Sequence, residues 1–278
     1  MPGKPKKLAI LAGGGILPKQ VAEACLREDI PYFAVDLGGT AGSWIKQHDP
    51  LVVSLGQVGR LLDTLKAEKC DAVTMAGPLA RPQLSSVRFD WRGTKLLPRL
   101  AKLFRKGDDA LLRGIAELFE ENGFRVVGPE TVLQDALAEA GVLTATSPND
   151  DAVQDISMAR EILTSLSPHD VGQAVVVANG ICVAVEAAEG TAQMLKRVAG
   201  LRDGKAPAGV LVKLPKLDQD RRVDLPTIGP ETATAAARAK LTGIAVEAGN
   251  GFILEREETI RLCNEAGLFL IGLSSPAK

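Results

Sequence analysis

The 278-residue sequence is poor in the residue types that build most metal centres and nucleic-acid interfaces. Its only two histidines, His48 and His169, lie far apart, which excludes sites assembled from several histidines, such as those of zinc hydrolases. Aromatic residues make up 4% of the chain and the formal net charge is −1, so bases find few stacking platforms and a phosphate backbone finds no excess positive charge. We therefore expect no nucleic-acid partner. Any hydrolytic chemistry must depend on carboxylates and a hard cation.

Closely spaced cysteines and long apolar runs are also missing. The four cysteines include no Cys-x-x-Cys pair, which argues against a structural zinc site and against a disulfide framework. No run of about 18 apolar residues could span a bilayer, and the first residues lack the pattern of a secretory signal. We therefore expect a cytoplasmic protein with reduced thiols.

Hydrophobic runs alternate with helical periodicity through the first half of the chain. The predicted strands cover residues 7–12, 31–36, 51–55, 71–76 and 124–127, and the predicted helices cover 17–26, 57–67, 94–105, 108–121 and 130–140. Because this alternation is typical of βαβ units, we expect residues 1–143 to form a Rossmann-like α/β domain with a mostly parallel sheet.

A polar, proline-containing segment at residues 144–149 is the predicted linker to a second α/β domain at residues 150–278. This domain is expected to begin with a helix over 150–163. Apolar runs on both sides of Asn179-Gly180 are typical of a β-hairpin, and further strands are expected at 243–247 and 268–273. Ligands of α/β proteins bind beyond the carboxyl ends of strands and between domains, so the active site is predicted to lie between the two domains.

Two glycine-rich turns follow predicted strands of the first domain. In Gly13-Gly14-Gly15-Ile16-Leu17-Pro18 the glycines would let the backbone approach a ligand, and the start of the following helix offers N–H groups to an anion. The third glycine of the dinucleotide fingerprint is missing, although Asp36 could bind a ribose. The second turn contains Gly77 and Pro78, with Arg81 available for a phosphate. This pattern favours contact with a nucleotide or a phosphate.

A basic segment extends from Arg81 to Lys106, with eight basic residues and one acidic residue, Asp90. Within it, Lys95, Arg99, Lys102 and Lys106 share one face of a predicted amphipathic helix. Such a helix can lie on an anionic membrane surface or pack on a core with its basic face solvated, and the sequence leaves both open.

Charged residues of both signs crowd the segment 209–230. The segment begins as a strand, and its prolines exclude a helix. Its cations could hold a phosphate, and its carboxylates could bind a divalent metal or orient a water; a solvated loop with weak ion pairs is the alternative. The charged residues are Lys213, Lys216, Asp218, Asp220, Arg221, Arg222 and Asp224.

Five motifs occur in an order that is similar to one enzyme family. They are Ala12-Gly-Gly-Gly-x-Leu-Pro18, Met75-Ala-Gly77 with Arg81-Pro82, Gly107-Asp-Asp-Ala-Leu-Leu-Arg113, Glu186-Ala-x-Glu-Gly-Thr191 and Gln219-Asp-x-Arg-x-Asp-Leu-Pro-Thr-Ile-Gly229. Together they resemble the metal-dependent UDP-2,3-diacylglucosamine pyrophosphatases of lipid A biosynthesis, the type unrelated to calcineurin-like phosphoesterases. The resemblance covers nearly the whole chain.

This resemblance implies a two-domain, magnesium-dependent enzyme. It would split UDP-2,3-diacylglucosamine into UMP and 2,3-diacylglucosamine 1-phosphate (lipid X), with water attacking the sugar-side phosphorus. The family's key aspartate falls on Asp224, which would bind the metal or orient the water, and Asp220, Arg222 and Lys213 would complete the catalytic set. The implied substrate-binding residues are Gly13, Gly14, Ile16, Gly77, Pro78, Arg81, Thr94, Asp108, Glu189, Gly190, Thr191, Gln219 and Thr227. Leu217 stands where the family pattern has a second proline, which puts the local shape of the loop in doubt.

An acylated substrate would place the protein at the cytoplasmic face of the inner membrane as a peripheral protein, docked through the basic segment. A homodimer stays open. Two other functions also stay open from the residues alone: a nucleotide-sugar or NAD-dependent oxidoreductase, and a non-catalytic regulator that binds a nucleotide sugar or lipid.

Overall fold

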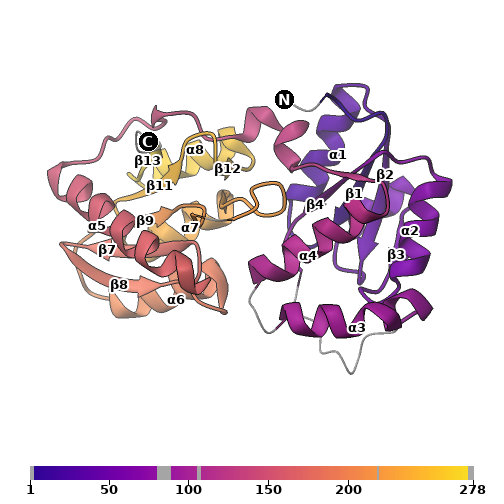
Figure 1. The fold of residues 1–278 in the computed structure, drawn as a ribbon. Coiled ribbons are helices and arrows are strands. Elements are labelled where there is room, and N and C mark those ends of the chain that lie inside the picture. Colours follow the sequence, from indigo (N-terminus) through magenta and orange to yellow (C-terminus); the bar gives the residue numbers. More distant parts are fainter. Residues whose placement is uncertain (1–2, 80–88, 105–107, 218, 275–278) are drawn as a thin grey trace. The chain divides into compact units, whose positions relative to one another are not determined.

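The computed structural model describes residues 3–79, 89–104, 108–217 and 219–274 (Figure 1). Its contacts divide the chain into two compact units. Unit 1 contains residues 1–134 together with Asp220–Asp224, and unit 2 contains residues 135–219 and 225–278. Each unit is a mixed α/β structure, so the prediction of two α/β domains is confirmed.

Unit 1 is built on a five-stranded parallel sheet with the strand order β3-β2-β1-β4-β5. Ala12 is in register with Asp36 and with Ala76, so the carboxyl ends of the three central strands lie at one edge. The expected Rossmann-like arrangement is therefore confirmed. The elements are β1 (Leu8–Ala12), α1 (Leu17–Arg27), β2 (Tyr32–Leu37), β3 (Leu51–Val53), α2 (Val58–Ala67), β4 (Ala72–Ala76), α3 (Trp91–Phe104), α4 (Asp108–Glu121) and β5 (Arg125–Val126).

Apolar residues at helical spacing attach the helices of unit 1 to this sheet. Leu61, Leu62 and Leu65 of α2 belong to the same buried cluster as Leu11 of β1, because residues three and four apart share one helix face. Val223, from the segment Asp220–Asp224, is also buried in this cluster. The core of unit 1 thus includes a residue from far along the chain.

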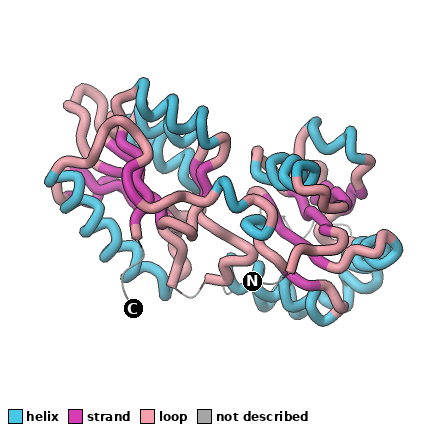
Figure 2. The backbone as a smooth tube through the Cα atoms, turned by 90° about the horizontal axis from the view of Figure 1, so that it is seen from above, coloured by secondary structure: helices cyan, strands magenta, loops and turns pink. Residues whose placement is uncertain are grey.

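Unit 2 contains a six-stranded mixed sheet with the order β6-β13-β11-β9-β7-β8, and its strands lie between helices (Figure 2). β9, β11 and β13 are parallel, whereas β7 runs antiparallel to β9 and β6 runs antiparallel to β13. A short parallel pair, β10 with β12, forms separately. The elements are β6 (Gly141–Val142), α5 (Asp150–Leu166), β7 (Ala174–Ala178), β8 (Ile181–Val185), α6 (Gly190–Leu201), β9 (Val210–Lys213), β10 (Thr227–Ile228), α7 (Pro230–Arg238), β11 (Gly243–Glu247), β12 (Phe252–Ile253), α8 (Arg256–Glu265) and β13 (Phe269–Leu273).

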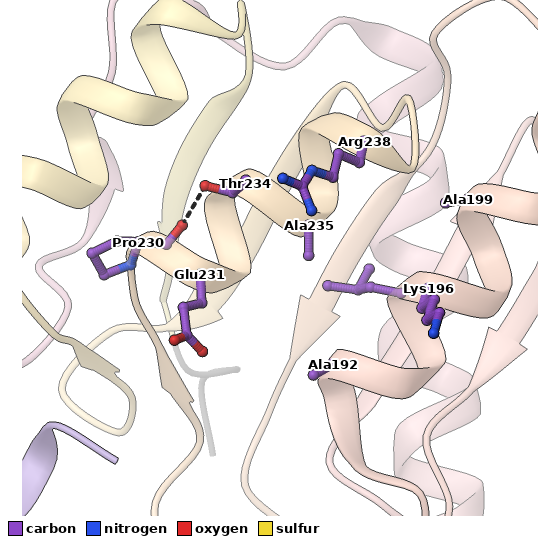
Figure 3. Close-up of a pocket in the computed structure, with 9 residues that line it drawn as sticks. Ala192, Lys196, Ala199, Pro230, Glu231, Thr234, Ala235 and Arg238 are labelled. Carbon is purple, nitrogen blue, oxygen red and sulfur yellow. Dashed lines mark hydrogen bonds between the residues drawn. The ribbon is translucent and has the colours of Figure 1, made fainter.

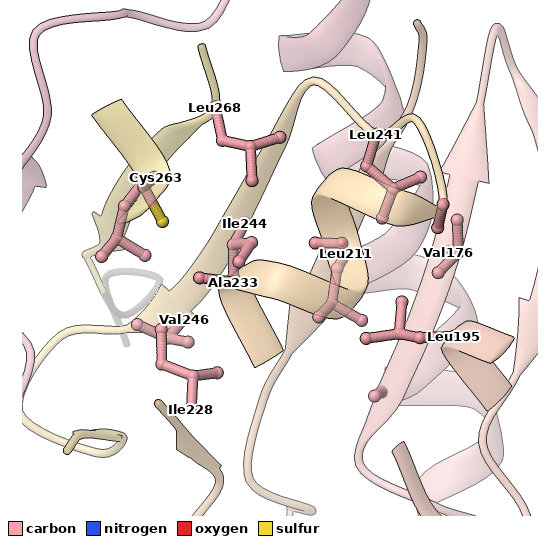
Figure 4. Packing of buried hydrophobic residues seen from close by; sticks show 14 of the residues in the cluster. Val176, Leu195, Leu211, Ile228, Ala233, Leu241, Ile244, Val246, Cys263 and Leu268 are labelled. Atoms are coloured by element: carbon pink, nitrogen blue, oxygen red, sulfur yellow. The ribbon is translucent and has the colours of Figure 1, made fainter. Parts of the chain in front are cut away.

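The two faces of this sheet have separate cores, because successive strand residues point to opposite sides. Leu211 and Ile244 pack with α6, α7 and α8 on one face, as Figure 4 shows, whereas Val210 and Val212 pack with α5 on the other. Since both faces are covered, β7, β9 and β11 contain runs of consecutive apolar residues instead of alternating apolar and polar ones.

The predicted hairpin at Asn179-Gly180 is confirmed, with β7 and β8 as its arms. Both turn residues have positive φ angles, 53° and 72°, as the tight hairpin turn requires. Buried Asp155 of α5 accepts the N–H groups of both residues, which fixes the turn to the helix below it.

Two predictions at the boundary between the units are wrong. Residues 130–140 form no α-helix: the short 3₁₀ helices Pro129–Thr131 and Gln134–Ala136 are followed by a bridge from Leu137 to Phe252. The boundary falls at Gln134/Asp135 instead of in a linker at 144–149. The reason is that β6 pairs with β13 and Leu143 donates its N–H to Leu270, which places the segment after residue 135 in unit 2.

Candidate functional site

The two glycine turns of unit 1 are bonded to each other at the carboxyl edge of the sheet. Gly13 donates its N–H to Ala76 at 2.8 Å, and Gly14 donates to Pro78 at 2.9 Å. Gly77 has φ +84°, and a Cβ atom added to it would lie 2.1 Å from the Gly14 carbonyl oxygen. The structure therefore brings Gly13, Gly14, Gly77 and Pro78 together, but it uses the N–H groups of Gly13 and Gly14 internally rather than leaving them for an anion.

The start of α1, beside these turns, offers helix N–H groups to an anion. Its N-cap residue is Ile16, which has no side chain that could accept the first N–H groups of the helix. Asp36, at the end of β2, is buried and accepts the Ala41 N–H at 3.1 Å. This turn-stabilising role accounts for Asp36 without a bound ribose.

Three other residues of unit 1 are predicted to bind the substrate. Thr94 is exposed on α3, and its hydroxyl donates to the Asp90 carbonyl at 2.9 Å. Asp108 begins α4, although its side chain is not described. Arg81 lies outside the described residues. The roles of Arg81, Thr94 and Asp108 stay predictions.

Part of the predicted basic face of α3 is used inside unit 1. Arg99 forms ion pairs with Glu117 and Glu121 of α4, at 3.0 and 2.8 Å. Lys95 instead lies over the ring of exposed Trp91, with its Nζ 4.8 Å from the ring centroid. The side chain of Lys102 and the whole of Lys106 are outside the described residues.

The segment Asp220–Asp224 has a fixed charged pair at its start. The Arg222 guanidinium donates from Nε to Asp220 Oδ1 at 2.9 Å and from Nη2 to Asp220 Oδ2 at 2.7 Å, and its Nη1 reaches Glu120 at 2.6 Å. These hydrogen bonds hold the pKa of Asp220 below its usual value, and they raise the pKa of Arg222. Buried Val223, whose N–H bonds the Asp220 carbonyl at 3.0 Å, anchors the segment in the core of unit 1.

Glu130 is a carboxylate near this pair that sequence reasoning missed. Burial raises its pKa, and the charge of Asp220 adds to the effect. Its Oε2 is buried and accepts no hydrogen bond from the described residues. A lone glutamate in a proline turn has no sequence signal that would mark it as unusual.

The carboxylates of this segment are the candidate ligands for magnesium. Within the described ranges, no three or more histidine, cysteine, aspartate or glutamate side chains gather so that they could hold a metal ion. A preformed all-protein cage is therefore not present in that part of the chain. Mg²⁺ commonly binds through one or two carboxylates, with waters and substrate phosphates completing its octahedron. Half-buried Asp224, with the ionised Asp220 in the same segment, fits that second kind of site in the chemistry of its donors.

In unit 2 the predicted residues Lys213, Thr191 and Thr227 come together. Lys213, the last residue of β9, is 8% exposed, and its Nζ donates to Thr191 Oγ1 at 2.9 Å and to the Thr227 carbonyl at 3.1 Å. Thr191 lies in the first turn of α6, which begins at Gly190 with φ +78°. A buried cation thus stands beside a helix N-terminus, an arrangement that suits a phosphate oxygen.

The other two predicted residues of unit 2 have structural partners. Glu189, the N-cap residue of α6, pairs with Arg197 at 2.7 Å. Gln219 is buried, and its Oε1 accepts the Lys216 N–H at 3.0 Å, which shapes the turn before the charged segment. Gln219 therefore organises the backbone of this turn, whereas Glu189 is held by its ion pair with Arg197 of α6.

An apolar groove of about 580 Å³ runs between α6 and α7, starting at Ala192, the neighbour of Thr191, and at Pro230 (Figure 3). Lys196 and Arg238 supply positive charge and Glu231 negative charge. The groove is lined by Ala192, Leu195, Lys196, Ala199, Pro230, Glu231, Thr234, Ala235 and Arg238.

Comparison with known proteins identifies the family to which these motifs belong. The family model for the LpxI N-terminal domain matches residues 7–136, and that for the LpxI C-terminal domain matches residues 139–271. The chain belongs to the LpxI family. It is 40% identical over 273 residues to the UDP-2,3-diacylglucosamine pyrophosphatase LpxI of Caulobacter vibrioides, covering 96% of this chain and 98% of that protein. One family model ends at residue 136 and the other begins at residue 139, close to the boundary between the two units at Gln134/Asp135.

The predicted LpxI-family site residues fall into both units. Unit 1 holds Gly13, Gly14, Ile16, Gly77, Pro78, Thr94, Asp108, Asp220, Arg222 and Asp224, and unit 2 holds Glu189, Gly190, Thr191, Lys213, Gln219 and Thr227. Across the described ranges, every helix is too short or too polar to cross a bilayer.

Proposed function

We propose that this LpxI-family protein hydrolyses the pyrophosphate of UDP-2,3-diacylglucosamine to UMP and lipid X, a step of lipid A biosynthesis. The observation that carries the proposal is 40% identity, over nearly the full length of both chains, to a protein of that named activity. The same identity favours the hydrolase over an NAD-dependent oxidoreductase and over a non-catalytic regulator. The ordered charged segment and the buried Lys213 would supply the carboxylates and the cation that such a reaction needs.

In the proposed reaction, a water oxygen forms a bond to the sugar-side phosphorus while the bond from that phosphorus to the bridging oxygen breaks. The bridging oxygen leaves with UMP, and the proton lost by the water passes to solvent or to a carboxylate. Negative charge develops on the phosphoryl oxygens. Lys213, with the first turn of α6, would hold one of them; its contact with Thr191 at the start of that helix supports this role.

Asp224 would bind Mg²⁺ or orient the attacking water, and Asp220 would stay ionised beside it in sequence. When bound, Mg²⁺ would neutralise charge on the non-bridging oxygens. Arg222 would hold a phosphate oxygen, and the hydrogen bonds from its guanidinium to Asp220 and Glu120 would keep the Asp220 carboxylate in position.

The protein would act at the cytoplasmic face of the inner membrane, because its substrate carries two acyl chains. Exposed Trp91 with Lys95 on α3 supports this placement, since tryptophan and lysine side chains suit the membrane–water interface. A homodimer is the proposed assembly.

The proposal is tested by incubating the purified protein with UDP-2,3-diacylglucosamine and Mg²⁺ in H₂¹⁸O. We expect UMP and lipid X in equal amounts, with ¹⁸O in the phosphate of lipid X. Label in UMP would show attack on the other phosphorus. No UMP under any divalent cation would contradict the hydrolase, and reduction of added NAD would then favour the oxidoreductase.

A further inference from the structure

The groove between α6 and α7 has an apolar floor to which the proposed function gives no part. Its volume of about 580 Å³ is within the range of sites that bind small ligands. Leu195 and Ala199 of α6 line it on one side and Ala235 of α7 on the other, with the two alanines labelled in Figure 3. Because alanine side chains are short, they leave space between the two helices. The groove therefore suits a narrow apolar chain.

The charges along this groove follow an order from one end to the other. Glu231 lies in the first turn of α7, where the groove begins, and Arg238 lies in the last turn of the same helix (Figure 3). Lys196 lines the groove from α6. Among the described residues, the side chains of Lys196 and Arg238 have no ion-pair or hydrogen-bond partner. An anionic group is therefore attracted to the Arg238 end and repelled at the Glu231 end.

Arg202 adds a buried cation at the Arg238 end. It is the C-cap residue of α6, and it shares a helix face with Leu195 and Ala199, because residues three and seven apart lie on one side of a helix. It is only 6% exposed. Its Nη2 donates to the Ala206 carbonyl at 2.8 Å, but its buried Nε has no acceptor in the part of the chain that the structure describes. A buried guanidinium needs an acceptor to offset its lost hydration.

The helix dipole explains only part of this arrangement. The C-terminal ends of α6 and α7 are joined, since the Ala208 N–H donates to the Lys240 carbonyl at 3.0 Å. A cation in the last turn of a helix is stabilised by the dipole, which accounts for the position of Arg238. The dipole does not account for Lys196 in the middle of α6 or for the unsatisfied Nε of Arg202. Guanidinium groups bind phosphate through parallel N–H groups, so this end of the groove fits a phosphate.

We propose that the α6–α7 groove binds one anionic phospholipid of a bilayer, with an acyl chain along the apolar floor and the phosphate at Arg202 and Arg238. Burial of the chain and ion pairing of the headgroup would act together in such a site. This lipid is a different ligand from the substrate of the proposed function. The surface belongs to unit 2, whereas Trp91 and Lys95 of α3 belong to unit 1.

Photo-crosslinking maps this ligand directly. The full-length protein is mixed with phosphatidylglycerol vesicles containing a trace of phosphatidylglycerol with a diazirine on one acyl chain, irradiated, digested and analysed by mass spectrometry. We expect labelled peptides from α6 and α7. A diazirine near the glycerol should label close to Arg238, and one at the end of the chain should label close to Pro230. Label confined to other parts of the protein, such as α3, would overturn the proposal.

Single substitutions test the charges and the floor. Arg238→Gln and Lys196→Gln should each lower the labelling of α6 and α7 about fivefold at low salt, the contribution of one basic residue near an anionic surface. Arg160→Gln removes the same charge from α5, which covers the opposite face of the sheet, and should have no effect. Ala235→Phe fills the floor without a change of charge and should also lower the labelling, with Tm as the check on folding. Equal labelling of wild type, Arg238→Gln and Lys196→Gln would overturn the proposal, whether or not Ala235→Phe folds.

Thermal unfolding tests buried Arg202. Dispersed short-chain phosphatidylglycerol should raise the Tm of the wild type, because a ligand that binds only the folded state stabilises it, and should not raise the Tm of Arg202→Met. An equal rise in both proteins would overturn a contact between the phosphate and Arg202. Inorganic phosphate with the same effect as the lipid would assign the cations to a free anion and overturn the lipid site.

Other occupants of the groove give different results. Equal labelling from phosphatidylcholine vesicles would show that the groove does not recognise an anionic headgroup, which would overturn the proposal. A dimer that dissociates in Ala235→Phe would assign the groove to a second copy of the chain, with the same consequence. None of these measurements uses UMP release, so failure of the lipid site and failure of the proposed hydrolase are distinguishable.

Discussion

The Arg222 guanidinium donates hydrogen bonds to both carboxylate oxygens of Asp220, two positions earlier in the chain, at 2.9 and 2.7 Å. Its third nitrogen reaches Glu120 on α4, and Val223 beside it is buried in the core of unit 1. The loop that carries the predicted catalytic aspartates is therefore held in place by a charged fork and by an apolar anchor.

Replacing Arg222 by Gln should weaken the fold in a pH-dependent way. The pKa of Asp220 is lowered from its ordinary 3.8 in the fold, so the pair stabilises the protein above that pH and the contribution is lost as the pH falls through the folded value. Thermal unfolding should show a lower Tm for Arg222→Gln at pH 7, by an amount equivalent to about 1 kcal/mol or less, and a shrinking difference below pH 3.8. Arg261→Gln, which removes a similar fork to Glu258 on the exposed face of α8, is the control and should have a smaller effect. A constant difference at all pH values would contradict this account.

Glu130→Gln should stabilise the protein. Burial raises the pKa of Glu130, so the folded state binds a proton more tightly than the unfolded chain and stability falls as the pH rises through and above 4.5. The variant removes a buried charge with an unsatisfied oxygen. We expect a gain of about 1 kcal/mol at pH 7, measured by urea unfolding, that disappears toward pH 4. An equal or lower stability at pH 7 would show that the carboxylate has a partner in solution.

Gly77→Ala should be among the most damaging small substitutions. The new methyl group would meet the Gly14 carbonyl at 2.1 Å in a backbone with φ +84°, so we expect a loss of about 2 kcal/mol or more. Gly200→Ala, in α6 with open space around it, is the matched control and should raise stability by up to about 1 kcal/mol. Similar effects of the two substitutions on Tm would contradict the close approach of the two turns.

Most strands and helices could be predicted because their cause is local. Alternating apolar runs and helical spacing marked β1 to β5 with α1 to α4, and Asn179-Gly180 marked the hairpin, since positive φ angles are favoured there. Residues 130–140 misled the same reasoning. Their apolar side chains are spaced like those of a helix, but the backbone instead bonds to distant residues such as Phe252 and Gly251.

The sequence predicts which residues belong to the candidate site better than it predicts the contacts that those residues make. Lys213, Thr191 and Thr227 were each named as site residues from the sequence, and in the structure they contact one another. The sequence could not show that Gly13 and Gly14 donate their N–H groups to carbonyls at and just after the end of β4, because that pairing depends on the order of the strands. Nor could it show the fork from Arg222 to Asp220, which depends on how one loop folds back on itself.

The membrane proposal predicts binding to anionic vesicles. Lys95→Ala should weaken co-sedimentation with phosphatidylglycerol vesicles about fivefold at low salt, because each lysine near such a surface contributes about 1 kcal/mol. Trp91→Ala should also weaken it, whereas Lys66→Ala, at an exposed position of α2 in the same unit, should not. Binding that does not respond to salt or to Lys95 would contradict docking through α3.

The most direct test of the proposed function is UMP release from UDP-2,3-diacylglucosamine by wild type and by Asp224→Asn, each with Mg²⁺ and with EDTA. We expect Mg²⁺-dependent release by the wild type and a rate lower by about a thousandfold or more in Asp224→Asn, with its Tm unchanged within a few degrees. Wild-type activity in a folded Asp224→Asn protein would contradict a role for this carboxylate in the chemistry, and no release by the wild type would contradict the hydrolase.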